Sequence, residues 1–105
     1  MTLAGNAGMW RQIQKMQAEM AKIQEELGAK TVEASAGGGA VKVTVNGHLE
    51  LKAVKIDPAA VDPAEVEMLE DLILAAVNEG LRKAQEMAGA AMAKFTGGLK
   101  LPGLG

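Results

Sequence analysis

The sequence predicts an α+β fold in which a helix, a three-stranded antiparallel β-meander and a long second helix follow one another (α-β-β-β-α). Residues 41–46 alternate valine with polar side chains, which is the period-two pattern of a strand with one buried face. A glycine triplet at 37–39 precedes this strand and Asn46-Gly47 follows it, and both are signals of chain reversal. Long patterns with helical period lie on either side of the three strands.

The first helix is expected to begin at Met9, because apolar residues then recur at alternating steps of four and three. This heptad stripe consists of Met9, Ile13, Met16, Met20, Ile23 and Leu27. Gly28 is a suitable stop signal at the C-terminal end. Residues 1–8 are small and aperiodic, so a disordered N-terminus is expected before a single α+β domain over residues 9–95.

The outer strands are expected on either side of residues 41–46. Residues 31–36 alternate in the same way and predict the first strand, and residues 48–56 predict the third. The apolar phase of the third strand slips after Ala53, which indicates a β-bulge near that residue. A lone three-stranded sheet of small side chains leaves its edges exposed and is marginally stable, so a second copy of the chain is expected to support it.

The second helix has a dense start signal. Asp62, Pro63 and Glu65 match an N-cap, a first helical position and the third position of a capping box. From there an apolar pattern continues to about Phe95. Residues 96–105 are rich in glycine and include proline, so a flexible tail is expected to follow.

Charge is distributed unevenly although the net charge is only −2. Residues 57–81 include acidic side chains and no basic ones, whereas both ends of the chain are basic. Antiparallel pairing of the helices would bring the basic ends together, away from the sheet. The side chains expected to contact an anionic partner are Arg11, Lys15, Lys22, Arg82, Lys83, Lys94 and Lys100. A solvated helix face is the alternative interpretation of the set on the first helix.

Several classes of function are not expected. The chain has no cysteine and one histidine, so thiolate chemistry and a zinc-type metal site are excluded, and no catalytic constellation is present. An enzyme, a cofactor and a small-molecule substrate are therefore not expected. The longest apolar run, residues 72–77, is too short for a membrane span, and residues 1–8 lack the features of a signal peptide. These features favour a cytoplasmic protein without a membrane partner.

Several short segments point to one family when they are taken together and in order. They are QKMQAEM at 14–20, EASAGGG at 33–39 with VKVTVNG at 41–47, IDP at 56–58, MLEDL at 68–72, AAVN at 75–78 and LPG at 101–103. With these segments, the chain resembles the YbaB/EbfC family of bacterial nucleoid-associated proteins. The resemblance implies a tweezer-like homodimer that is joined through its sheet region. It also implies protruding helical arms that bind double-stranded DNA on the nucleoid.

Two hypotheses of function follow. In the first, a dimeric architectural protein binds DNA through phosphate contacts with weak sequence specificity, and its affinity falls steeply with salt. In the second, the apolar arms hold a partner helix, with Met16, Met20 and Met87 as adaptable contact residues. Reversal of the arm charges would abolish binding only under the first hypothesis.

Overall fold

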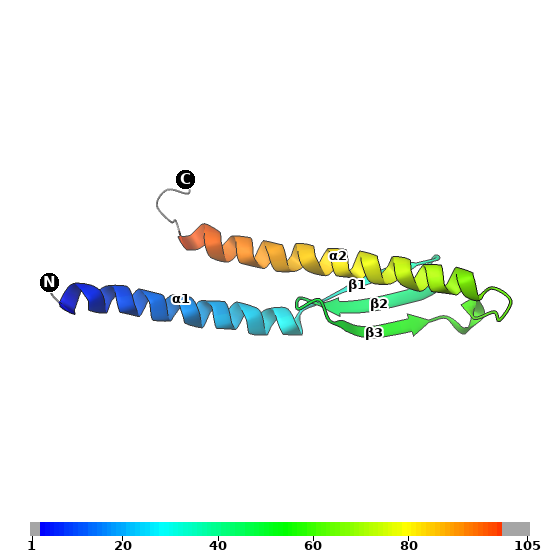
Figure 1. Cartoon of the computed structure of the whole chain (residues 1–105), viewed down its shortest axis with the longest axis horizontal. Coiled ribbons are helices and arrows are strands. Elements are labelled where there is room, and N and C mark those ends of the chain that lie inside the picture. The colour runs from blue at the N-terminus through cyan, green and yellow to red at the C-terminus, as the bar shows by residue number, and fades with distance from the viewer. Residues whose placement is uncertain (1–2, 100–105) are drawn as a thin grey trace.

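The computed structural model describes residues 3–99, which form two long helices and one open sheet (Figure 1). The elements are α1 (Leu3–Ala29), β1 (Thr31–Ala36), β2 (Val41–Asn46), β3 (Leu51–Ile56), the short 3-10 helix η1 (Pro58–Ala60) and α2 (Val66–Leu99). This order confirms the predicted α-β-β-β-α fold. The molecule measures 76 × 25 × 16 Å, because both helices extend far beyond the sheet on the same side.

The sheet is an antiparallel meander in the order β1-β2-β3. Thr44 pairs with Ala53 and Val45 pairs with Leu51, so Lys52 is an extra residue in β3. This irregularity confirms the β-bulge that was predicted near Ala53. One face of the sheet is covered by α2, which packs over β1 and β2 and hardly touches β3.

The core lies between β2 and α2 and is built from small side chains. Val41, Val43 and Val45 of β2 are fully buried, with at most 1% of their surface exposed. On α2, Gly80 allows a close approach, because a Cβ at this position would lie 2.9 Å from Cγ2 of both Val43 and Val45. The remaining buried core residues are Ala34, Ala76 and Ala84. The core is therefore thin and confined to the sheet end of the molecule.

Both helices have boundaries that differ from the predicted ones. α1 begins at Leu3, six residues before the predicted start at Met9, and the disorder expected before Met9 stays a prediction. Extension of an existing helix requires no new nucleus, which allows a segment without an apolar stripe to join it. α2 continues past Phe95 to Leu99, and the rest of the expected flexible tail lies outside the described residues.

The predicted capping box at Asp62 is wrong, and α2 begins at Val66. Asp62 instead closes a separate turn. Its Oδ1 atom accepts a hydrogen bond from the Ala64 amide at 3.0 Å, and its carbonyl accepts one from the Glu65 amide at 2.8 Å. The Glu65 carbonyl then accepts the first helical bond, from the Leu69 amide at 3.4 Å. The Asp62 side chain therefore caps the turn that precedes α2 and not α2 itself.

Candidate nucleic-acid interface

The helical arm is the part of the molecule that extends beyond the sheet. α1 and α2 run antiparallel along it, and α1 reaches past the last described turn of α2 (Figure 1). The two helices touch each other sparingly. The arm therefore exposes most of its side chains to solvent. Within residues 3–99, no helix is both long and apolar enough to cross a membrane.

A hollow of about 590 Å³ lies between the two helices of the arm. Its apolar lining includes Ile23, Leu27, Met87 and Phe95, and its charged lining consists of Lys22, Lys30 and Lys94 with Glu19 and Glu26. Lys22 and Lys94 were both predicted contact residues, and both line this hollow although they come from different helices. Lys30 was missed by the sequence analysis, because it follows the end of the apolar stripe.

Arg11 and Lys15 lie further out on α1, and both side chains are exposed. The chain has no acidic residue before Glu19, so the charged side chains of this outer part of the helix are all basic. Helical rotation of about 100° per residue places Arg11, Lys15 and Lys22 on the same side of α1. This side presents positive charge over about three turns of helix.

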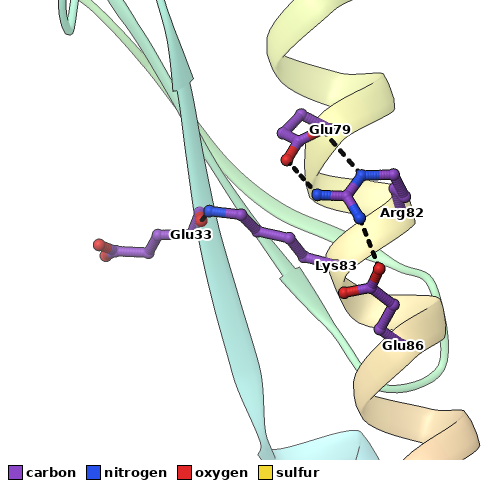
Figure 2. A network of polar contacts seen from close by, with 5 residues as sticks. All are labelled: Glu33, Glu79, Arg82, Lys83 and Glu86. Atoms are coloured by element: carbon purple, nitrogen blue, oxygen red, sulfur yellow. Dashed lines mark hydrogen bonds and ion pairs between the residues drawn. The ribbon is translucent and has the colours of Figure 1, made fainter.

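Arg82 and Lys83 do not join the arm tip, contrary to the predicted arrangement. Both lie where α2 crosses the sheet, and Figure 2 shows their partners. The Lys83 ammonium donates a hydrogen bond to the Glu33 carbonyl of β1 at 3.1 Å. The Arg82 guanidinium pairs with Glu79 one turn before it and with Glu86 one turn after it. The seventh predicted contact residue, Lys100, lies outside the described residues.

The paired carboxylates largely balance the charge of Arg82. Its hydrogen bond and charge lower the pKa of Glu79, and the same contacts raise the pKa of the arginine. All three side chains remain in contact with solvent, so the network contributes little to stability. The main consequence of the network is electrostatic. The two carboxylates beside Arg82 weaken its attraction for a phosphate group.

A second basic surface, on the open face of the sheet, was also missed by the sequence analysis. Lys42 of β2 and Lys55 of β3 are directly opposite each other, and both are exposed. Like charges in opposite positions repel. The signal was present in the alternating pattern, which places both lysines away from the buried valines. Lys52 in the bulge adds a third exposed charge nearby.

The β2–β3 loop fixes α1 to the sheet. The Gly47 amide donates to the Leu27 carbonyl at 2.8 Å, and the Asn46 side-chain amide donates to the Gly28 carbonyl at 3.1 Å. The His48 ring contacts the Gln24 carbonyl at 2.7 Å. These groups satisfy carbonyls in the last turns of α1, which otherwise touches the body of the protein at few places. The loop therefore sets the direction of the arm.

The edge of the sheet at β3 has an uncovered apolar surface, which we call the β3 flank. Leu51 and Val54 lie on the same sheet face as the buried valines, yet they are 45% and 44% exposed. On α2, Lys83 faces β1 and Gly80 faces β2, so Val77, one step further around the helix, faces the β3 side. The β3 flank consists of Leu51, Val54, Leu74 and Val77.

Among residues 3–99, the structure groups no three histidine, aspartate or glutamate side chains in a way that could hold a metal ion. The outer part of α1, with Arg11 and Lys15 exposed and no acidic residue, is a described part of the arm where positive charge is not offset.

Known proteins resemble this chain in sequence and in fold. The model of the YbaB/EbfC DNA-binding family matches residues 3–99. A nucleoid-associated protein of Moorella thermoacetica is 67% identical over 90% of this chain and 91% of its own length. One of Pelotomaculum thermopropionicum is 56% identical over 97% of this chain and 98% of its own. An uncharacterized protein of known structure, HP0035 from Helicobacter pylori, has the same fold, with a TM-score of 0.74 at 22% identity over 91% of this chain and 98% of its own.

Proposed function

The chain belongs to the YbaB/EbfC DNA-binding family, and we propose that it binds double-stranded DNA as a homodimer through its helical arms. Its role is that of a weakly sequence-specific architectural or regulatory protein of the bacterial nucleoid, in the cytoplasm. The observation that best supports this role is the outer part of α1, where Arg11 and Lys15 are exposed and no acidic residue precedes Glu19.

The contacts are expected to be made mainly with phosphates. The major groove admits an α-helix, and Arg11 and Lys22 are about 16 Å apart along the helix axis. Exposed lysines and an arginine on one side of a helix can therefore contact several phosphates of one duplex. Such contacts fix the orientation of a protein on DNA without selecting a sequence.

The contact residues that we propose are a subset of those predicted from the sequence. Arg11, Lys15, Lys22 and Lys94 are exposed on the arm, and Lys30 lies beside the last two. If each of four cations neutralises one phosphate, log K should fall against log salt with a slope of about −4 for one arm and about −7 for two. Arg82 and Lys83 contribute less, because their charged groups already have partners within the protein.

The dimer contact that we propose is the β3 flank. β3 is an edge strand, so its outer backbone groups have no partner within the sheet. Leu51, Val54 and Leu74 are exposed apolar side chains beside this edge. A second copy of the chain on this surface would bury these three side chains. In each subunit the arm lies at the end away from the sheet, so both arms would remain free.

The test compares two triple variants with the same change in net charge. One is R11E/K15E/K22E on the arm, and the control is K42E/K52E/K55E on the open sheet face and bulge. Fluorescence anisotropy with a labelled duplex at low salt should show a loss of roughly a hundredfold for the arm variant and a change of a few-fold for the control. Equal losses would show that only the total charge matters, and a loss confined to the sheet variant would overturn the assignment to the arm.

The hollow between α1 and α2 favours one alternative, in which the arm holds a partner helix. Met87 lines this hollow, whereas Met16 and Met20, the other two residues predicted for this role, are half-buried on α1 and do not line it. The charge-reversed arm variant distinguishes the hypotheses. Partner binding through an apolar hollow would survive the reversal, while I23A/M87A would abolish it and leave DNA binding intact.

A further inference from the structure

Trp10 is exposed on the outer part of α1. Its exposed fraction is 61%, and the neighbouring Met9 and Ile13 are 62% and 38% exposed. The N-terminal turns of α1 extend past the described end of α2 (Figure 1), and the high exposed fractions of Trp10 and Met9 agree with a surface that no described element covers. A cluster of large apolar side chains left in water indicates a contact surface.

The charge around this cluster indicates the kind of partner. The first 18 residues contain Arg11 and Lys15 as their only charged side chains. Helical rotation places the Gln14 and Gln17 amides on either side of Trp10. A nucleic acid combines phosphates for the two cations with flat base faces for an indole ring. The combination of positive charge, amides and one flat aromatic ring is complementary to nucleic acid.

We infer that Trp10 stacks on a base of duplex DNA at a base-pair step where the normal stacking is interrupted. This inference rests on the proposed function. Arg11, about 100° around the helix from Trp10, is the nearer cation and holds a phosphate on one side of the stacked base. Lys15 lies about 140° from Trp10 and adds positive charge to the same stretch of helix without sharing its face. The π-face of any base can accept this stacking, so the contact selects a deformed site rather than a sequence. DNA that already has an unpaired base avoids the cost of unstacking and should be bound more tightly than a continuous duplex.

The composition of the chain permits a direct measurement. Trp10 is the one tryptophan and no tyrosine is present, so tryptophan emission reports on this position alone. The full-length protein is titrated at constant low salt with a continuous duplex and with the same duplex containing one unpaired adenine. We expect strong quenching of the emission and reduced access to acrylamide, with half-saturation at a lower concentration of the bulged duplex.

Two variants separate stacking from simple apolar contact. W10L keeps a large apolar side chain without a π-face, and W10F keeps the π-face. On the bulged duplex, anisotropy should show W10L bound roughly tenfold more weakly and W10F close to the wild type. On the continuous duplex, the difference between W10L and the wild type should be smaller.

The other outcomes overturn the inference in distinguishable ways. Equal binding by all three proteins with unchanged emission would remove the role of Trp10 and leave the proposed DNA binding intact. A change in sedimentation of W10L without DNA would assign this surface to self-association instead. Absence of DNA binding by the wild type at low salt would remove the proposed function and this inference together.

Discussion

Gly47, in the β2–β3 loop, is a point of close approach to α1. A Cβ atom at this residue would lie 2.6 Å from the Leu27 carbonyl oxygen and 2.8 Å from two atoms of the Leu27 side chain. The obstructing oxygen belongs to the backbone and accepts the hydrogen bond of Gly47 itself. The glycine is therefore required by the contact between two elements.

We predict that Gly47→Ala destabilises the protein by about 1–3 kcal/mol, because the β2–β3 loop must separate from α1. Gly89→Ala is the matched control. Gly89 lies within α2 and a Cβ there would meet nothing within 4 Å, so alanine should stabilise the helix by about 0.5–1 kcal/mol. Urea unfolding followed by circular dichroism measures both changes. A neutral Gly47→Ala variant would show that the loop does not hold α1.

The loop around Gly47 also shows what residue patterns can and cannot predict. Asn46-Gly47 marks a chain reversal, as predicted, but the reversal is not the two-residue type I′ hairpin that this dipeptide favours. In the structure Leu49 adopts a positive φ of 62° instead of Gly47, and the Asn46 amide pairs with the Glu50 carbonyl. β3 consequently begins at Leu51 rather than His48. The cause is long-range, because Asn46 also binds a carbonyl of α1, which no local pattern contains.

At the scale of elements, the two faces of the sheet differ: one packs against α2, and the other brings like charges together. Towards α2, the valines of β2 are buried, whereas on the open face Lys42 and Lys55 are directly opposite each other. Opposed like charges on an antiparallel pair are destabilising. Threonine fits an exposed strand position better than lysine does.

We predict that Lys55→Thr stabilises the protein by about 0.5 kcal/mol at low salt, with a smaller gain at high salt as screening reduces the repulsion. Lys52→Thr is the control, because Lys52 lies in the bulge without a cross-strand partner. Thermal unfolding at two salt concentrations measures the difference. An equal gain in the two variants would mean that the cross-strand repulsion is negligible.

Periodicity predicted the elements better than it predicted their relative positions. The alternation in residues 31–36 and 41–46 gave both strands with their observed bounds. In contrast, Arg82 and Lys83 were expected at the arm tip, because helix length alone does not determine where α2 crosses the sheet. That crossing depends on the fit of Gly80 against Val43 and Val45. A small residue within a helical pattern gives little indication of such a contact.

At the scale of the whole molecule, side-chain packing is unevenly distributed along one long axis. The radius of gyration is 20.9 Å, compared with about 13 Å for a compact domain of this length. The sheet end contains the buried core and the β3 flank, and the opposite end contains exposed cations and few packed side chains. A dimer joined at its sheet end would hold two such arms at a fixed separation. The second arm would then bind the same duplex at a high effective concentration.

Such bivalency depends on the contact between the two subunits. Val54→Lys places a charge in the β3 flank and should convert the proposed dimer to a monomer at micromolar concentration, because burial of an unpaired charge is unfavourable. Loss of the second arm should weaken DNA binding by roughly a hundredfold and reduce the salt slope from about −7 to about −4. Ala53→Lys is the control, since Ala53 is exposed on the opposite face of the same strand. Sedimentation velocity and salt-titrated anisotropy measure the two effects. If Val54→Lys were still dimeric, the subunits would have to join elsewhere, and a monomer with unchanged affinity and slope would show that a single arm performs the binding.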